Sequence, residues 1–318
     1  MSADKNKPQT AEDGERIAKF LARSGVASRR EVERLIEAGK VTVNGKRLDT
    51  PAFKVDGSEK IVVDGEPVEP IAPAKLWLYH KPAGLVTTHK DPEGRQTVFE
   101  ALPKDIGRVI SVGRLDLTSE GLLLLTNDGG LARALELPST GWTRRYRARA
   151  FGSVDEAGVN KLRSGITVEG VRYGKMEVEV ERETGSNVWL NIGLKEGKNR
   201  EVRRVLEAIG LRVNRLIRIS YGPFQLGQIE KGEVKAVPGR ILKDQCGHLL
   251  SDNAAAMVGD GEARAKKPAG RRPSRGSATG KPQGGAPGRT QGGSEGKYGG
   301  KPGGKPGGRP SPKPRTRR

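Results

Sequence analysis

The chain has 318 residues and a formal net charge of +20, and +14 of that charge lies in residues 261–318, where 16 Lys and Arg stand against 2 Asp and Glu. Those residues contain no Val, Ile, Leu, Met, Phe or Trp, so they lack the apolar surface that a folded core requires. No run approaches the roughly 20 apolar residues that cross a bilayer, and a single cysteine, Cys246, excludes internal disulfides and Cys-based zinc sites.

Residues 1–14 are polar and are expected to form a flexible N-terminal segment. They contain no apolar stretch typical of a secretion signal, and the acidic residues Glu12 and Asp13 argue against an Arg-rich transit peptide. This start, together with the absence of an apolar span, predicts a cytoplasmic protein that is not bound to a membrane.

Residues 15–48 carry the pattern helix, helix, hairpin. Apolar side chains recur at helical spacing over residues 17–21, and Ser28 with Glu31 forms a capping box in front of a second helix. The dipeptide at residues 44–45 is Asn-Gly, which is typical of a tight type I′ hairpin turn. These local signals agree on one small α+β unit.

The polar positions of this unit are largely basic, and such side chains can follow a phosphate backbone. On charge alone they are also compatible with an ordinary solvated helix face. The run RIAKFLARSGVASRREVERLIEAGKVTVNGKRL, however, resembles the S4 RNA-binding domain along its whole length. The resemblance implies that the second helix and the adjoining loop face structured RNA. The candidate RNA-binding residues here are Arg16, Lys19, Arg29, Arg30, Arg34 and Lys46.

Residues 50–73 contain a short apolar run at 61–63, predicted to be the last strand of the small unit, and a linker near residues 67–73. We therefore expect the S4 domain and its linker at residues 15–73, a larger domain at residues 74–250, and a disordered basic tail at residues 251–318.

Strand signals dominate residues 74–250. Their hairpin-like succession favours a mixed sheet of the α+β class over alternating parallel units. No G-x-G-x-x-G motif follows a strand and no P-loop occurs, so nucleotide-cofactor folds lack sequence support. Strands are predicted at residues 76–79, 122–125, 145–151, 176–181 and 188–194, and helices at residues 97–102, 130–137, 154–164 and 200–209.

The most informative segment is residues 112–129, where a polar, Gly-flanked turn with Arg114 and Asp116 directly precedes the apolar strand. A rigid strand that follows a turn is a favourable support for a functional carboxylate. An Asp in such a turn is, on its own, more often a hydrogen-bonded turn residue. The turn at residues 127–129 is assigned no chemistry.

The sequence GRLDLTSEGLLLLTNDG resembles the active-site motif of the RsuA/RluB branch of the pseudouridine synthases. The likeness extends through HKPAGLVTT, RRYRARAFG and EGKNREVRRVLEAIGLRVNRLIRISYGPFQLG, in that order, and an S4 domain in front is the expected arrangement. It implies a mixed, mainly antiparallel sheet with flanking helices and a cleft across it. It also implies isomerisation of uridine to pseudouridine in RNA, a reaction that needs neither a metal nor a cofactor.

The same resemblance implies roles for individual residues. Asp116 is the essential carboxylate, which adds to the sugar or removes its C2′ proton, and either role needs the ionised form that a neighbouring cation favours. Arg203 is the expected cation, with Arg204 as an adjacent competitor. Tyr146 is expected to stack on the uracil or to assist proton removal, although it is also compatible with an ordinary half-buried strand residue. Candidate RNA contacts are Arg114, Lys198 and Arg200.

Within this branch, the S4 unit, the segment RRYRARAFGSVDE and the tail most resemble the RluB type, which modifies 23S rRNA near the peptidyl-transferase centre. The expected partner is therefore 23S rRNA or an assembly intermediate of the large subunit, bound by a monomer, with the target base flipped out of its stack. Alternatives are the same activity on 16S rRNA and a non-catalytic RNA-binding or ribosome-assembly protein. A methyltransferase lacks its glycine loop, and a glycosidase-like pair of Asp116 and Glu120 lacks sugar-binding aromatics.

Overall fold

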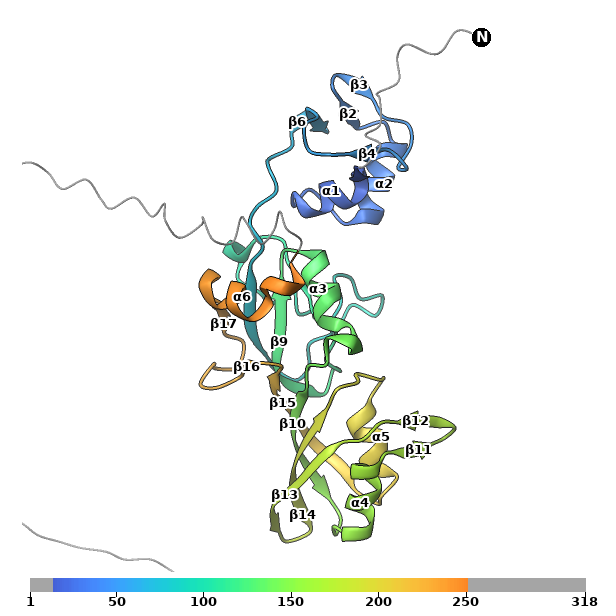
Figure 1. Cartoon of the computed structure of the whole chain (residues 1–318), viewed down its shortest axis with the longest axis vertical. Coiled ribbons are helices and arrows are strands. Elements are labelled where there is room, and N and C mark those ends of the chain that lie inside the picture. Colours follow the sequence, from blue (N-terminus) through green and yellow to red (C-terminus); the bar gives the residue numbers. More distant parts are fainter. Residues whose placement is uncertain (1–13, 251–318) are drawn as a thin grey trace, which may run out of the picture. The chain divides into compact units, whose positions relative to one another are not determined.

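The computed structural model describes residues 14–250 of the 318-residue chain. The flexible segment expected at residues 1–14, apart from Gly14, and the disordered tail expected at residues 251–318 lie outside the described residues. Within residues 14–250, no helix is long and apolar enough to cross a membrane. Figure 1 labels most of the helices and strands of this part of the chain.

Residues 15–67 form a small α+β unit with a core of its own, which includes Leu21, Val32 and Val43. Helices α1 (Ile17–Arg23) and α2 (Arg29–Glu37) accompany a four-stranded sheet in the order β3-β2-β5-β6, and β1 pairs with β4. The strands are β1 (Glu15–Arg16), β2 (Val41–Val43), β3 (Lys46–Arg47), β4 (Lys54–Val55), β5 (Ile61–Val63) and β6 (Glu66–Pro67).

The local signals of this unit form as predicted. Ser28 Oγ accepts a hydrogen bond from the Glu31 backbone N–H at 3.2 Å and so caps α2. The Glu31 carboxylate is paired with Arg34. Asn44 and Gly45 have φ angles of 50° and 76°, which are the positive values that a type I′ turn requires. The predicted helices, hairpin and strand at residues 61–63 are confirmed.

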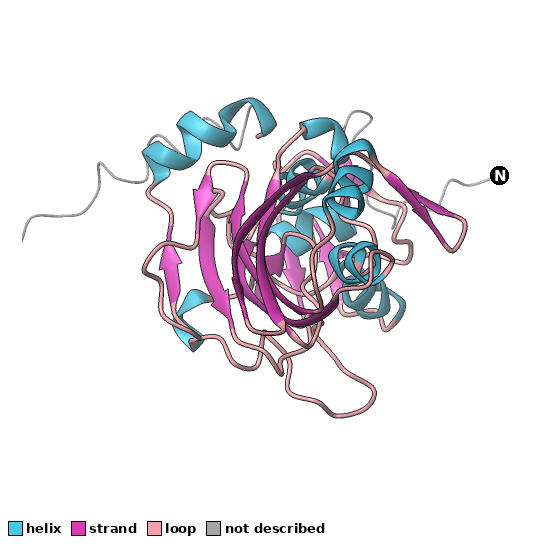
Figure 2. Ribbon diagram, turned by 90° about the horizontal axis from the view of Figure 1, so that it is seen from below, coloured by secondary structure: helices cyan, strands magenta, loops and turns pink. Residues whose placement is uncertain are grey.

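The larger part of the fold is a nine-stranded sheet whose main path runs β13-β14-β10-β15-β9-β7-β17. Among the described residues, β15 and β9 are its parallel pair and its other pairs are antiparallel. The predicted mixed, mainly antiparallel sheet is confirmed, and Figure 2 shows its curved strands with helices flanking them. The strands are β7 (Leu76–Lys81), β8 (Ile110–Ser111), β9 (Ser119–Thr126), β10 (Arg144–Phe151), β13 (Glu177–Thr184), β14 (Asn187–Leu194), β15 (Arg212–Tyr221), β16 (Phe224–Gln225) and β17 (Val234–Ala236).

Strand β9 lies at the centre of the packing, because all of its residues are buried. Leu122 and Leu124 belong to the apolar cluster under α3 and α6, whereas Leu123 and Leu125 belong to the cluster on the opposite face. A third cluster fills the space between the sheet and α4 and α5. The remaining elements are η1 (Lys104–Ile106), α3 (Gly129–Glu136), η2 (Pro138–Thr140), α4 (Glu156–Ser164), β11 (Ile166–Val168), β12 (Val171–Tyr173), α5 (Glu201–Glu207), α6 (Gly239–Cys246) and η3 (Gly247–Leu249).

The predicted strands of this part, and three of its four predicted helices, are present, with ends that shift by up to three residues. The helix predicted at residues 97–102 is wrong. Thr97 forms a bridge with Val86, and Thr97 Oγ1 accepts from the Glu100 N–H at 3.2 Å while Glu100 accepts from the Thr97 N–H at 2.8 Å. This reciprocal cap closes a single turn, and Pro103 follows before a helix can extend.

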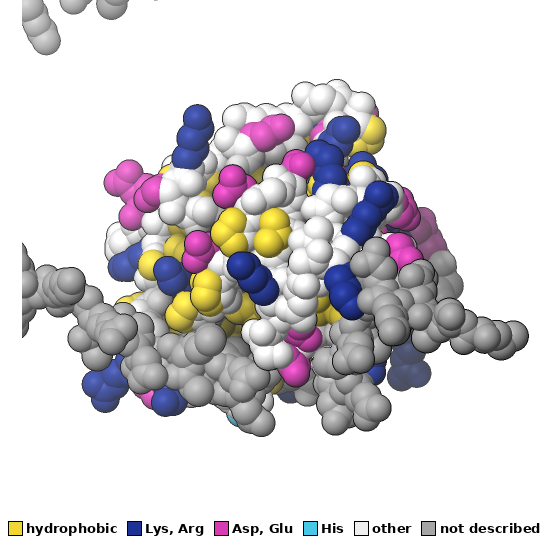
Figure 3. Space-filling model, turned by 90° about the horizontal axis from the view of Figure 1, so that it is seen from above, with side chains coloured by type: hydrophobic (Ala, Val, Ile, Leu, Met, Phe, Trp, Pro, Cys, Tyr) yellow, Lys and Arg dark blue, Asp and Glu magenta, His cyan; other side chains and the backbone are white. Residues whose placement is uncertain are grey.

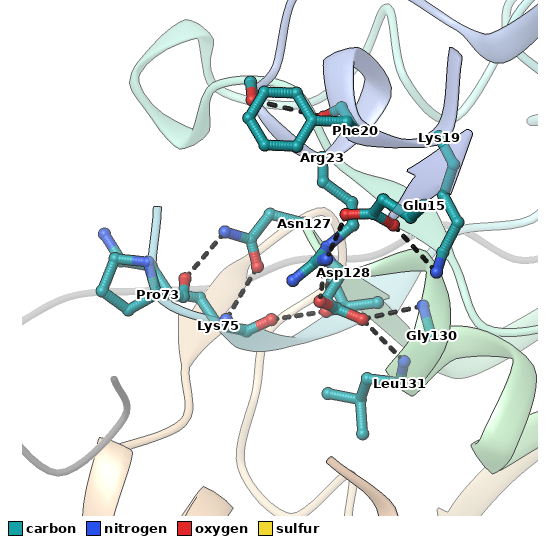
Figure 4. Close-up of polar contacts among 12 residues, drawn as sticks. Glu15, Lys19, Phe20, Arg23, Pro73, Lys75, Asn127, Asp128, Gly130 and Leu131 are labelled. Atoms are coloured by element: carbon teal, nitrogen blue, oxygen red, sulfur yellow. Dashed lines mark hydrogen bonds and ion pairs between the residues drawn. The ribbon is translucent and has the colours of Figure 1, made fainter. Parts of the chain in front are cut away.

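The residues after β9 act structurally (Figure 4). Asn127 Oδ1 accepts from the Lys75 N–H at 2.7 Å, and its Nδ2 donates to the Pro73 carbonyl at 2.9 Å, so one side chain fixes the chain just before β7. Asp128 Oδ1 accepts from the backbone N–H groups of Gly130 and Leu131 at 2.7 and 2.8 Å and caps α3. These contacts agree with the interpretation of this segment as a turn without chemistry.

Candidate active site

A cavity of about 980 Å³ opens where the start of β9 meets β10, β15 and the chain before α5. Asp116, Tyr146 and Arg200, three residues predicted from sequence, are part of its wall, together with the predicted RNA contacts Arg114 and Lys198. These side chains are up to 86 residues apart in sequence, from position 114 to position 200. The fold therefore brings the motifs of the sequence to one cavity.

The turn that carries Asp116 is held in place by hydrogen bonds to its backbone. Thr87 Oγ1 donates to the Leu115 carbonyl at 2.8 Å and lies 3.3 Å from the Leu115 backbone nitrogen, which donates to it. The Asp116 carbonyl accepts from the Ser119 N–H at 3.0 Å. The Asp116 side chain itself is 31% exposed and contributes to the cavity wall. Its backbone is thus rigid, while its carboxylate stays accessible.

Two arginines approach the Asp116 carboxylate. Arg203 Nε and Arg200 Nη1 each lie 3.9 Å from Asp116 Oδ2, a distance of electrostatic attraction rather than of a hydrogen bond. Arg203 is the more buried of the two, at 11% exposed against 49%, and it donates to the carbonyls of Val213 and Thr118 at 3.2 and 3.3 Å. Arg203 is thus a fixed cation and Arg200 a solvated one.

The sequence predicts Arg203 beside Asp116, with Arg204 as a competitor, and gives no indication that Arg200 lies there as well. Arg200 adopts φ 50°, the left-handed conformation, at the residue that precedes α5, and no regularity of the sequence indicates this. Arg204 has no ion pair with Asp116 within residues 14–250. Burial, and then the neighbouring Arg200, lowers the pKa of Arg203 from its ordinary value, and Asp116 opposes that shift. A carboxylate between them relieves the repulsion between the two cations.

Tyr146 lies on β10, where its register partners are Ile192 on β14 and Arg218 on β15. The side chain is half-buried against two of the apolar clusters and forms part of the cavity wall. A rigid aromatic ring in the wall of an open cavity offers a surface on which a planar base can stack.

Lys81 was missed by sequence reasoning, although it lies in the quoted segment HKPAGLVTT. It is 0% exposed, and its Nζ donates to the carbonyls of Pro82, Asp116 and Ser119 at 3.0, 3.2 and 3.0 Å. Burial lowers the pKa of Lys81 to about 8, although the charges of Asp116 and Glu120 oppose the shift. Lys81 therefore ties the turn of Asp116 to the start of β9. The only sequence signal was a Lys at the end of an apolar strand.

Glu120 is not available as a catalytic acid. Its carboxylate accepts from Arg215 Nε at 2.7 Å and lies 2.7 Å from Lys231 Nζ. The hydrogen bond from Arg215 and then that from Lys231 hold the pKa of Glu120 at about 2, against the opposing effect of burial. A carboxyl with such a pKa does not donate a proton near neutral pH, so a glycosidase-like pair with Asp116 has no acid.

The candidate RNA-binding residues fall into two groups. Some are already engaged in ion pairs: Lys19 with Glu15 at 2.8 Å, Arg34 with Glu31, and Lys198 with Glu196. Others are exposed at the surface, namely Arg16, Arg29, Arg30 and Arg114. Lys46, on β3, is half-buried. Figure 3 shows one face of the molecule, where Lys and Arg side chains are interspersed with acidic ones. Among residues 14–250, no three His, Cys, Asp or Glu side chains gather as metal ligands do.

Comparison with known families gives two matches. The S4 domain family matches residues 15–61, and the RNA pseudouridylate synthase family matches residues 75–208. An uncharacterized RNA pseudouridine synthase of Rickettsia typhi is 45% identical over 228 residues, which cover 72% of this chain and 93% of the relative.

Other relatives have more specific names. The ribosomal large subunit pseudouridine synthase B of Shigella flexneri is 44% identical over 220 residues, which cover 67% of this chain and 75% of the relative. A crystal structure of a pseudouridylate synthase aligns with a TM-score of 0.53 at 23% identity, covering 74% of this chain and 100% of its own. At that identity the solved structure supports the fold alone.

Proposed function

Because this chain belongs to the RNA pseudouridine synthases, we propose that it converts one uridine of 23S ribosomal RNA, near the peptidyl-transferase centre, to pseudouridine, with Asp116 as the essential carboxylate. The observation that carries the proposal is the cavity in which Asp116 lies 3.9 Å from both Arg203 and Arg200 and shares a wall with Tyr146. The name of the Shigella flexneri relative, a large-subunit synthase, supports the choice of rRNA.

Asp116 acts as a carboxylate. Arg203 and Arg200 each place a positive charge 3.9 Å from its Oδ2. The carboxylate either adds to C1′ of the ribose or removes the C2′ proton, and both routes break the C1′–N1 bond. The uracil then turns, C5 joins C1′, and the proton on C5 is lost. Both routes use the same Asp116, so the geometry is compatible with either.

Tyr146 supports the base. The target uridine leaves its stack to reach Asp116, which costs a few kcal/mol of stacking and pairing energy. A ring in the cavity wall restores part of that stacking, and its hydroxyl is a candidate to remove the proton on C5. The alternative, an ordinary half-buried strand residue, does not explain why the ring borders the cavity of Asp116.

The RNA is held at several places. Arg114, Lys198 and Arg200 at the cavity rim are suited to the phosphates beside the extruded nucleotide, and the basic side chains of the S4 unit are suited to a neighbouring stem. This arrangement fits a division into an S4 domain with its linker at residues 15–73 and a catalytic domain at residues 74–250. The proposed partner is 23S rRNA or an assembly intermediate of the large subunit, bound by one copy of the chain.

The test is a map of rRNA pseudouridines by carbodiimide-dependent reverse-transcription stops, in a strain that lacks its own enzyme of this type. We expect the wild-type chain to produce one new stop in 23S rRNA and Asp116→Ala to produce none. Asp116→Asn, which keeps the side-chain shape, separates loss of charge from loss of fold. A stop in 16S rRNA would change the target, and an equal stop with Asp116→Ala would overturn the assignment of the carboxylate.

A further inference from the structure

Arg218 lies in the floor of the cavity and has no place in the mechanism given above. It is 2% exposed and forms part of the cavity wall together with Asp116 and Tyr146. On β15 it is the register partner of Tyr146 on one side and of Gly121 on the other. A cation is therefore fixed between the strand that carries the aromatic ring and the strand that follows the catalytic turn.

The charge of Arg218 is incompletely satisfied. Its Nε donates to the Leu122 carbonyl at 2.7 Å, and its guanidinium carbon lies 5.1 Å from the centre of the Tyr221 ring. Its Nη2 is buried and has no hydrogen-bond partner, and no carboxylate pairs with Arg218 within residues 14–250. A buried cation without an anion is costly, and such a group is kept where a ligand completes it.

A second buried arginine gives the contrast. Arg144 is 6% exposed and also lies against the Tyr221 ring, at 4.7 Å. Its Nη1 donates to the Lys195 carbonyl at 2.5 Å, and its Nη2 donates to the Glu136 carbonyl and the Tyr221 hydroxyl at 3.1 and 2.7 Å. Both terminal nitrogens of Arg144 thus have hydrogen-bond acceptors within the protein, and Arg144 holds Tyr221 in place. Arg218, on the same ring, belongs to the cavity wall and keeps a buried Nη2 that no described protein group pairs with.

The position of Arg218 indicates which part of an RNA it meets. Phosphates belong to a chain that continues outside the cavity, so they are matched by the exposed cations at the rim. A flipped base is the part of the nucleotide that reaches the floor. Among the atoms of uracil, only the carbonyl oxygens O2 and O4 accept hydrogen bonds from a guanidinium, which donates and never accepts.

We propose that Arg218 donates a hydrogen bond to a carbonyl oxygen of the extruded uracil and stabilises the negative charge of the departing base. The inference rests on the proposed function. When the C1′–N1 bond breaks, its electron pair leaves with N1, and the charge of the uracil anion spreads onto O2 and O4. The charge is neutralised when C1′ joins C5, the C5 proton is lost and N1 takes up a proton. Arg218 acts as a fixed donor where this charge develops.

The test compares two bases in single-turnover reactions of the full chain with an rRNA fragment that contains the mapped target. Arg218→Met is expected to slow conversion of uridine by about 10²–10³-fold, as for the loss of one oxyanion donor, with unchanged RNA affinity. With 5-fluorouridine at the target, consumption of the nucleoside is expected to suffer a smaller defect, because fluorine makes the base a better leaving group. Arg218→Lys, which keeps the charge, is expected to retain part of the rate.

The matched control is Arg212→Met on the same strand, where the arginine is exposed and lies over Phe151 instead of the cavity. Equal defects on both bases, with normal thermal unfolding, would overturn the inference. So would a defect confined to RNA affinity and its salt dependence, which would identify a phosphate contact. A wild-type chain that converts no uridine would overturn the proposed function and this inference with it, whereas an active wild type with an equally active Arg218→Met overturns the inference alone.

Discussion

Replacing Lys81 by Met removes the buried cation that ties the turn of Asp116 to β9. The ammonium group donates three hydrogen bonds to backbone carbonyls, at 3.0, 3.2 and 3.0 Å, and one of these carbonyls belongs to Asp116 itself. Methionine fills a similar volume and donates none of them. We therefore expect both the free energy of unfolding and the rate of the chemical step to fall.

The magnitude follows from two opposing contributions. Hydrogen bonds from a charged donor contribute about 1.5–3 kcal/mol each, so three of them amount to about 6 kcal/mol. Burial of the ammonium group lowers the pKa of Lys81 from 10.5 to about 8, which corresponds to a penalty of about 3 kcal/mol at neutral pH that methionine does not carry. The net loss for Lys81→Met is about 3 kcal/mol at pH 7.

The pH dependence has a definite sign. Between pH 8 and 10.5 the unfolded chain still holds the proton that folded Lys81 has released, so the titration of Lys81 makes folding more favourable as the pH rises. The difference in unfolding free energy between wild type and Lys81→Met should therefore widen over that interval. The wild-type rate should fall over the same interval, because a neutral amine has only two hydrogens for three carbonyls.

Urea unfolding followed by tryptophan fluorescence measures the first effect, and single-turnover rates from neutral pH to pH 10 measure the second. Lys235→Met, at an exposed position on β17, is the control for loss of one lysine. The reasoning is refuted if Lys81→Met keeps the wild-type rate at neutral pH. It is also refuted if the wild-type and variant rates decline in parallel above pH 8, since the variant has no amine to titrate.

Two further predictions concern charge. Arg203→Met should slow the chemical step more than Arg200→Met, because Arg200 is half exposed and solvent screens its attraction to Asp116. We expect the rate to fall about fivefold or less for Arg200→Met. Equal effects of the two substitutions would contradict the different roles given to the two arginines. Deletion of residues 261–318, which carry a net charge of +14, should weaken RNA binding at low salt and reduce the slope of log affinity against log salt concentration. The single-turnover rate should stay unchanged. A large loss of rate at normal RNA affinity would contradict this prediction.

The sequence predicts those elements whose signals are local. The cap of α2 by Ser28 and the tight turn at Asn44 are predictable because each depends only on residues nearby in the sequence. Strand β15 was not predicted, because it carries Arg215 and Arg218 among its apolar residues and shows no clean alternation. Both arginines have partners on β9: the exposed Arg215 pairs with Glu120, and the buried Arg218 donates to the Leu122 carbonyl. Such pairings are not visible along a single strand.

The residues of the candidate active site are likewise predictable only where their signal is local in the sequence. Asp116 stands out because its turn is flanked by glycine and followed by an apolar run. Lys81, Arg200 and Arg218 do not stand out, since each looks like one of the chain's 58 basic residues. What distinguishes them is burial or backbone conformation: Lys81 is fully buried, Arg218 is 2% exposed, and Arg200 has φ 50°. These properties arise from packing between distant segments.

Gly121 allows the strands that carry the site to approach each other closely. It has φ +105°, and a Cβ at this position would lie 2.3 Å from the Arg218 carbonyl oxygen. Only glycine permits this approach of the parallel strands β9 and β15. On the opposite side, β7 supplies Lys81 to the same end of β9. Strand β7 therefore holds the turn of Asp116 through Lys81, and β15 places Arg218 at the cavity. The carboxylate and the proposed base contact are thus fixed by the same three adjacent strands, β7, β9 and β15.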